Sequence, residues 1–103
     1  MKWHFSDGWN LDDFSTDLSF AVDTTLAADQ KTPFVTFTCS AASKSLVLDV
    51  APGDCMIVAN IGGTNAVTVK AIAGDTGTSV AAGKVALVIG SGTANASKIY
   101  VLN

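Results

Sequence analysis

One short string in this sequence has the residue types of a catalytic centre: Asp75, Thr76 and Gly77 form the triplet Asp-Thr-Gly. Two carboxylates that lie close together share one proton, and they divide the roles of general acid and general base between them. The triplet occurs once in the 103 residues, so a dyad of this kind requires a two-fold dimer. The first question is therefore whether Asp75 is half of such a dyad.

The surroundings of the triplet favour a β-hairpin loop instead. In aspartic proteases of the retroviral type, the triplet directly follows a hydrophobic strand in the first third of the chain, and a hydrophobic-hydrophobic-Gly segment supports it from far downstream. Here Gly74 precedes Asp75, the triplet lies three-quarters of the way along the chain, and the Val-Ile-Gly segment 88–90 comes too soon. Gly-Asp-X-Gly strings are typical of turns. We therefore predict that Asp75 is a turn residue.

No other combination of residues in the sequence builds a catalytic or cofactor site. His4 is the single histidine, so a Ser/His/Asp or Cys/His arrangement would depend on the N-terminal segment. His4, the scattered Asp residues and the two separated cysteines lack the spacing of metal ligands. The Gly-Ser-Gly segment 90–92 lacks the following helix that phosphate binding requires. We predict a protein without enzymatic activity, cofactor or metal.

Cys39 and Cys55 both lie in apolar runs that have the character of strands. Free cysteines are among the residues most often buried, and two cysteines do not make a disulfide scaffold. The sequence leaves two alternatives: two buried thiols, or one disulfide across neighbouring strands.

Composition limits the classes of function. Charged residues make up 15% of the chain and hydrophobic residues 49%, against about 25% charged in an average domain. Little charge means little repulsion between copies, which favours a subunit of an assembly. All bases are lysine and the net charge is −3, which argues against nucleic acid as a partner. The sequence offers neither an apolar run of about 18 residues for a membrane span nor a signal peptide, so we expect folding in a cytoplasm.

From residue 34 onward, short apolar runs alternate with turn residues. Val67 and Val69 against Thr68 and Lys70 illustrate the period of two, which predicts strands with one face in a core. The predicted strands are 17–25, 34–40, 45–50, 55–60, 66–71, 84–90 and 98–102. Most begin roughly 10 residues apart, which is typical of a sandwich or barrel. We predict an all-β fold: a small β-sandwich or jelly-roll-like domain of about seven or eight short strands.

The predicted connections agree with this fold. Segment 51–54 (Ala-Pro-Gly-Asp) has the composition of a Pro-Gly turn, with proline where its fixed φ is useful. Segment 60–65 (Asn-Ile-Gly-Gly-Thr-Asn) carries two glycines, which predicts the tip of a hairpin.

The N-terminal region differs from the rest because it is rich in aromatic residues. We divide the chain into an N-terminal arm, 1–16, and a single β-sandwich domain, 17–103. Aromatic side chains bring a large apolar area to a contact. The arm therefore either folds back over the core or anchors the protein in a partner; glycan stacking is a further alternative. The predicted partner contacts are Trp3, Phe5, Trp9 and Phe14.

The second half of the chain resembles a module of tailed-phage virion proteins, found in tail fibres, head fibres and capsid decoration proteins. The resemblance covers segment 46–103 and has three parts. They are Gly53-Asp54 before a hydrophobic strand, the segment 60–69 (Asn-Ile-Gly-Gly-Thr-Asn-Ala-Val-Thr-Val), and Ala82-Gly83-Lys84 before the next strand.

This resemblance implies a homotrimer with β-sandwich or jelly-roll subunits, often fixed to the particle by an N-terminal segment. It implies a non-enzymatic virion protein on the capsid surface, a decoration (cement) or head-fibre subunit, with the major capsid protein or another virion protein as partner. The alternative function is a carbohydrate-binding β-sandwich that recognises a host glycan. Small apolar residues of the last strands are candidate trimer contacts, or else core: Ala86, Val88, Ile99 and Val101.

Overall fold

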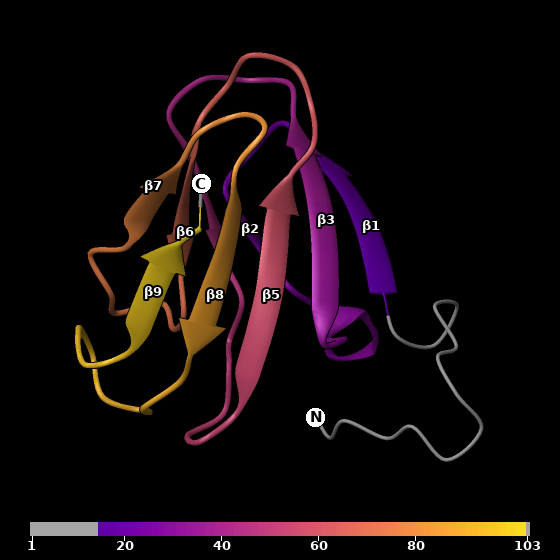
Figure 1. Ribbon diagram of the computed structural model, residues 1–103. Helices are drawn as coiled ribbons and strands as arrows, with labels where there is room; N and C mark the ends of the chain where they lie inside the picture. The colour runs from indigo at the N-terminus through magenta and orange to yellow at the C-terminus, as the bar shows by residue number, and fades with distance from the viewer. Residues whose placement is uncertain (1–14, 103) are drawn as a thin grey trace.

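A computed structural model describes residues 15–102, and within them the prediction of an all-β fold is confirmed (Figure 1). The described part contains nine strands and one short 3-10 helix, η1 (Ala28–Gln30). The strands are β1 (Ser15–Phe20), β2 (Thr24–Thr25), β3 (Phe34–Cys39), β4 (Lys44–Val47), β5 (Cys55–Asn60), β6 (Val67–Lys70), β7 (Thr78–Val80), β8 (Val85–Ile89) and β9 (Lys98–Val101). The predicted strand 17–25 is split into β1 and β2, and β7 has no counterpart among the predicted strands.

These strands form two mixed sheets. The five-stranded sheet has the order β1-β3-β5-β8-β9, in which β1, β3 and β5 pair in parallel and β8 and β9 are antiparallel to their neighbours. The four-stranded sheet has the order β2-β4-β6-β7, parallel except for β7. Strands β1 and β9 are the edges of the larger sheet and lie at opposite sides of the molecule (Figure 1).

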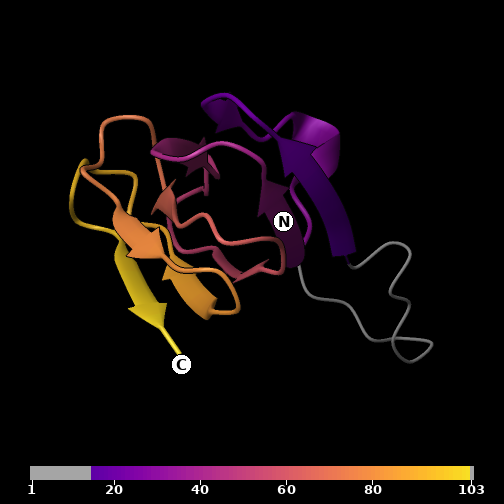
Figure 2. The ribbon, with the colours of Figure 1, turned by 90° about the horizontal axis from the view of Figure 1, so that it is seen from above.

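The chain passes back and forth between the two sheets, as the view from above shows (Figure 2). Each of the successive pairs β1–β2, β3–β4 and β5–β6 places one strand in each sheet, and the pairs stack in parallel. Phe34 of β3 pairs with Ile57 of β5, and Leu46 of β4 pairs with Val69 of β6, so the offset along the chain is the same in both sheets. The offset differs between the sheets one pass earlier, where Ser15 pairs with Phe34 and Thr24 pairs with Leu46. Strands β7 to β9 complete the two sheets with antiparallel pairs.

The buried sides of both sheets form one hydrophobic core. In β6, Val67 and Val69 are buried, while Thr68 and Lys70 are partly exposed, as the alternation predicts. Each large apolar side chain that is fully buried contributes about 1.5–3 kcal/mol relative to exposure. The largest fully buried apolar side chains are Phe37, Leu46, Leu48, Met56, Val35, Val58, Val67, Val69, Val80 and Val88.

The prediction that segment 60–65 forms a hairpin tip is wrong. The segment carries the chain from β5 in one sheet to β6 in the other. The buried Asn60 fixes this crossing, because its Nδ2 donates hydrogen bonds to the backbone oxygens of Asn65 (2.9 Å) and Val80 (3.0 Å). Gly63, with a φ of 57°, supplies backbone freedom that either a hairpin or a crossing needs, and Gly62 lies against the side chain of Thr38 with no room for a Cβ. The two glycines therefore do not distinguish a hairpin from a crossing. The turn at 51–54 is present, with the Asp54 N–H donating to the Ala51 oxygen.

Candidate functional site

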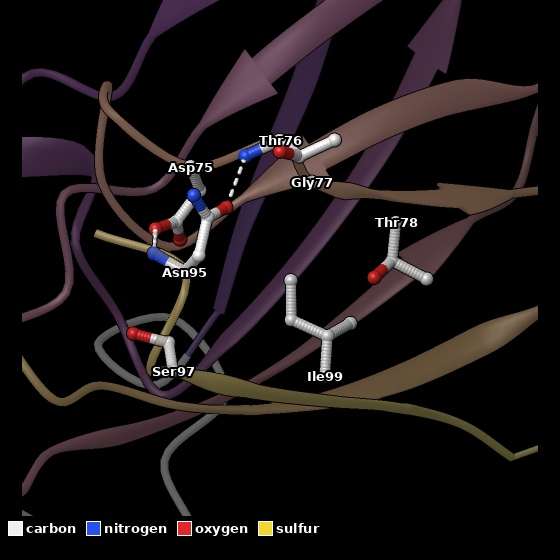
Figure 3. A pocket seen from close by; sticks show the side chains of 7 residues that line it. All are labelled: Asp75, Thr76, Gly77, Thr78, Asn95, Ser97 and Ile99. Carbon is white, nitrogen blue, oxygen red and sulfur yellow. Dashed lines mark hydrogen bonds between the residues drawn. The ribbon is translucent and has the colours of Figure 1, made fainter. Parts of the chain in front are cut away.

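Asp75 lies in the loop between β6 and β7, which are antiparallel neighbours, so the prediction of a hairpin loop is confirmed. Asp75 is 7% exposed, and its carboxylate is held by the backbone of two loops; Figure 3 shows the contact with Asn95. Oδ2 accepts hydrogen bonds from the N–H groups of Ala71 (3.1 Å) and Ile72 (3.3 Å). Oδ1 accepts one from the N–H of Asn95 (2.7 Å), in the loop between β8 and β9. Both carboxylate oxygens therefore accept hydrogen bonds from backbone amides.

A second hydrogen bond joins the same two loops, because the side-chain Oδ1 of Asn95 accepts from the Thr76 N–H (2.7 Å) (Figure 3). The two loops are thus joined by a reciprocal pair of hydrogen bonds, which we call the Asp75–Asn95 clasp. Gly77 has a φ of 87°, and a Cβ there would lie 2.6 Å from Cγ2 of Thr68 and 2.9 Å from the oxygen of Val69. The aspartate and the glycine of the triplet are both explained by the local fold.

A hollow of about 150 Å³ lies beside the clasp (Figure 3). It is lined by Asp75, Thr76, Gly77, Thr78, Asn95, Ser97 and Ile99. Pockets that hold small-molecule ligands usually measure about 300–1,000 Å³. Asp75 is the one carboxylate of this lining, whereas a shared-proton dyad needs two. A second carboxylate would have to come from another copy of the chain, and the hollow within one chain lacks the room of a substrate groove.

The two cysteines are free thiols, so the disulfide alternative is wrong. They lie toward opposite ends of neighbouring strands: Phe37, two residues before Cys39, pairs with Asn60, five residues after Cys55. This offset of seven residues corresponds to about 23 Å along extended strands, whereas the Cα atoms of a disulfide lie about 4.4–6.8 Å apart. Cys39 is buried and Cys55 is half-buried, so the prediction of two buried thiols holds for Cys39 and only partly for Cys55.

The outer side of the five-stranded sheet is apolar over its central strands β5 and β8, although the solvated side of a sheet is usually polar. Toward the edges the same side also carries polar residues, among them Asp17 of β1, Thr36 of β3 and Lys98 of β9. In β5 and β8, Met56, Val58, Ala86 and Val88 are buried in the core. Their neighbours along each strand therefore point outward. We call the apolar residues on this side the outer apolar face: Phe34, Cys55, Ile57, Val85, Leu87, Ile89, Tyr100 and Leu102.

The strand register makes this surface continuous. Phe34 pairs with Ile57, Ile57 with Leu87, and Leu87 with Tyr100, so one apolar row crosses four strands. The most exposed members of the face are Ile89 (38%), Tyr100 (51%) and Leu102 (54%). Contiguous apolar patches mark interaction sites more often than scattered apolar residues do. The outer apolar face is therefore the strongest candidate for a functional surface in the described part of the chain.

The four predicted trimer contacts share one side of β8 and β9, since Ala86 pairs with Val101 and Val88 with Ile99. That side faces the core. Ala86 and Val88 are fully buried within the single chain, so a trimer contact through these two residues is wrong: they have no surface left for another subunit. Ile99 packs against the core and Val101 is exposed, so a contact through these two stays a prediction.

The predicted partner contacts Trp3, Phe5, Trp9 and Phe14 lie outside residues 15–102. Ser15 and Thr16, which the prediction assigns to the arm, belong to β1. The predicted arm and the described domain thus meet at an edge of the five-stranded sheet.

The outer apolar face is not among the sequence predictions, although two strands carry a signal for it. Segments 55–59 (Cys-Met-Ile-Val-Ala) and 85–89 (Val-Ala-Leu-Val-Ile) are apolar at every position. Such runs are typical of strands that are covered on both faces. When one face of such a strand packs in the core, its other face is also apolar and remains available for contact with another surface.

Residues 15–102 contain no group of three or more His, Cys, Asp or Glu side chains that could hold a metal ion. No helix in this part of the chain has the length and apolar character needed to cross a membrane. Comparisons with protein families, curated proteins and solved structures give no match for the chain. Its function is therefore inferred from its residues and their arrangement.

Proposed function

We propose that this chain is a non-enzymatic structural subunit of a tailed-phage particle, a small capsid decoration (cement) or head-fibre protein that binds and stabilises the shell. The observation that carries the proposal is the outer apolar face, which the described residues leave half-exposed or exposed. Covering apolar surface is worth about 25 cal/mol per Å² removed from water. A partner that covers this face is therefore bound by the hydrophobic effect.

The site that suggested catalysis gives less support to an enzyme. Both oxygens of Asp75 accept hydrogen bonds from backbone amides, so the carboxylate serves the fold. A general acid or base must instead reach a substrate proton directly or through one water. The arrangement of these residues therefore supports a function in binding through an apolar surface more than it supports catalysis.

The resemblance of segment 46–103 to virion modules supplies the proposed partner, the major capsid protein or another virion protein. Residues that carry the resemblance have roles in the turns: Gly53 and Gly83 have φ values of 82° and 84°, and Asn60 holds the crossing between sheets. The proposed location is the capsid surface of a particle assembled in the host cytoplasm. Neither nucleic acid nor membrane enters the proposal.

We take the two sheets and their common core as a β-sandwich in this proposal. A jelly roll is built from two antiparallel Greek keys, whereas four of the seven strand pairs in the described residues are parallel. The parallel pairs therefore favour the sandwich over the jelly roll as the body that presents the outer apolar face.

In the assembled particle, the arm is the proposed anchor and the subunits form a homotrimer. Trp3, Phe5, Trp9 and Phe14 supply the apolar contacts of the arm with the shell, and the outer apolar face supplies those of the domain. A subunit that binds only the assembled shell stabilises it by linkage.

Co-sedimentation with emptied heads of the parent phage tests this function. Trp3→Ala, Trp9→Ala and Leu87→Ser should each weaken shell binding about 30-fold, the equivalent of about 2 kcal/mol. Val22→Ser serves as the control, because Val22 is exposed but lies in the connection between β1 and β2. Unchanged occupancy of the shell by the first three variants would contradict the proposal. Light scattering of the free protein across a dilution series should give the mass of a trimer.

The second candidate function, glycan binding, has one observation in its favour. Tyr100 is an aromatic residue that is 51% exposed on a sheet face, and sugar rings stack on such side chains. A glycan-array signal that is lost in both Tyr100→Ala and Trp9→Ala, with no binding to phage heads, would favour this function.

A further inference from the structure

Strand β9 is an edge of the five-stranded sheet, and among the described residues it pairs with β8 alone (Figure 1). Three apolar residues at this edge are exposed: Tyr100 and Leu102 on the outer side of the sheet, and Val101 on the inner side. Proteins usually protect an edge strand with charges, proline, bulges or a covering loop. Lys98 is the one charged residue of β9, so most of this edge is suited to contact with another strand.

The hydrogen-bond pattern of β9 determines which backbone groups face this edge. The Leu102 N–H donates to the oxygen of Val85 in β8 (2.7 Å), one step beyond the β8–β9 pairs. In an antiparallel ladder, residues alternate between bonding to the partner strand and directing their N–H and C=O groups away from it. Tyr100 therefore bonds toward β8 as Leu102 does, whereas Ile99 and Val101 direct their backbone groups to the free edge.

An antiparallel copy of β9 matches these free groups. When Tyr100 lies opposite Tyr100 of a second copy, Ile99 lies opposite Val101 of that copy. Each N–H and C=O group that the two residues direct to the edge then finds a partner on the other strand. The two tyrosines form a non-hydrogen-bonded pair, in which the side chains are closest, and aromatic pairs across strands are stabilising. The edge is therefore self-complementary in this register.

We propose that β9 pairs with β9 of a second copy of this chain, antiparallel and with Tyr100 opposite Tyr100. Residues that lie opposite each other point to the same side of a sheet. The outer apolar faces of the two copies therefore lie on the same side of one continuous sheet. This inference goes beyond the proposed function and does not rest on it: a three-fold trimer has no two-fold axis, so the pairing joins neighbouring trimers rather than the subunits of one trimer.

The size of the contact predicts when it forms. Strand β9 has four residues, which is about 14 Å of extended chain. Its pairing covers much less than the area of about 800 Å² that each partner buries in a stable interface. We therefore expect weak pairing in dilute solution and strong pairing where one surface holds many copies close together.

Cysteine cross-linking tests the register. In a Cys55→Ser background, the buried Cys39 is the remaining native thiol. Tyr100→Cys then places two Cα atoms about 4.5 Å apart, within the range of a disulfide. Lys98→Cys is the matched control on the same side of the same strand, but it lies about 14 Å along the strand from its counterpart. In concentrated protein with a mild oxidant, Tyr100→Cys should form linked dimers at least about tenfold faster than Lys98→Cys, and equal rates would overturn the proposal.

A proline variant tests the backbone contact while the tyrosine stays in place. Edge strands accept proline where the N–H faces away from the sheet, so Val101→Pro should keep the β8–β9 pairs and remove one donor from the free edge. Val101→Ala is the matched control, because it shortens the side chain and keeps the N–H. In sedimentation velocity over a concentration series, the mean mass should rise for the wild type and Val101→Ala and stay at its dilute value for Val101→Pro. Circular dichroism checks that each variant is folded.

Two results of these measurements would overturn the proposal: a wild-type mass that does not change with concentration, or a folded Val101→Pro variant that associates like the wild type. Loss of binding to emptied phage heads in Val101→Pro, without a Tyr100→Cys cross-link, would mean that β9 pairs with a strand of the shell, and this too would overturn it. Self-association is measured without phage heads. A protein that pairs through β9 but does not bind heads would therefore contradict the proposed function alone.

Discussion

Two regions of this molecule invite a functional interpretation for opposite reasons. The loop that contains Asp75 has the residue types of a catalytic centre, yet both oxygens of its carboxylate accept hydrogen bonds from backbone amides. The outer apolar face consists of ordinary strand residues, yet the described part of the chain leaves much of its surface uncovered. The type of a residue suggests which chemistry its side chain can perform. Whether another molecule can use that side chain depends on how much of it is still free of contacts within the fold.

The largest expected effect contrasts the two sides of β8. Val88 is fully buried in the core, and Leu87 lies beside it on the outer apolar face. Val88→Ser removes buried apolar volume and buries a hydroxyl, so it should lower the free energy of unfolding by about 3 kcal/mol. Leu87→Ser should cost only about 1 kcal/mol, because its side chain is partly hydrated already. Urea denaturation of both variants measures the difference, and equal losses would contradict the assignment of the two sides.

Asp75 should behave as a structural residue. Asp75→Ala removes the acceptor of three backbone hydrogen bonds, two from its own loop and one from Asn95, and should lower the free energy of unfolding by about 2–3 kcal/mol. Asp75→Asn keeps one acceptor oxygen but turns an NH₂ group toward a backbone N–H, so a loss of about 1 kcal/mol is expected. Thermal unfolding measures both.

The opposite pattern would revive the catalytic interpretation of this loop. A side chain that serves chemistry alone can be replaced by its amide without loss of stability. An Asp75→Asn variant as stable as the wild type would therefore break the contrast between the two regions. Asn95→Ala is the comparison within the clasp and should cost about 2 kcal/mol, because it removes the bond to the Thr76 N–H and places alanine at a left-handed φ of 62°.

Two glycines allow the effect of steric crowding beneath this loop to be separated from the effect of a left-handed backbone conformation. Gly77 and Gly83 have similar positive φ values, 87° and 84°, but a Cβ meets Thr68 and Val69 at Gly77 and nothing within 4 Å at Gly83. Gly83→Ala should therefore cost about 1 kcal/mol for the left-handed conformation alone. Gly77→Ala should cost about 2 kcal/mol because steric crowding is added. Similar midpoints in urea would mean that the loop relaxes and that the approach is not required.

The sequence predicts where the strands of this protein lie along the chain better than it predicts which strands pair with each other. Alternation in Val67-Thr68-Val69-Lys70 identifies a buried side, because a strand has one face in the core whatever strand it pairs with. Pairing depends on where the chain goes after each turn, and segment 60–65 crosses between sheets although its glycines suit a hairpin. Phe34 of β3 and Ile57 of β5 pair with each other, but the only property that the two residues share is their apolar character. The sequence around them therefore does not reveal the pairing.

The same limit explains the partly wrong trimer contacts. Ala86, Val88, Ile99 and Val101 do share one side of β8 and β9, as their spacing implies. Periodicity separates the two sides of a strand without saying which of them enters the core when both are apolar, and an error of one residue exchanges them. Asp75 was assigned correctly as a turn residue because Gly-Asp-X-Gly is a local signal. Its bond to the distant Asn95 has no such signal.

The smallest expected effect is a difference between the rates at which the two cysteine thiols react with a reagent. Cys39 is buried, and its Sγ donates to the oxygen of Ala41 (3.2 Å), so it should react with a thiol reagent only when the domain opens. Cys55 is half-buried on the outer apolar face and should react at least about tenfold faster in the native state, since access controls cysteine reactivity. Ile89→Ser changes the outer-face residue that pairs with Cys55, so it should speed labelling of Cys55 and leave Cys39 unchanged. Equal acceleration of both cysteines would instead indicate a general loss of stability, so this pair of rates separates exposure of the face from unfolding of the domain.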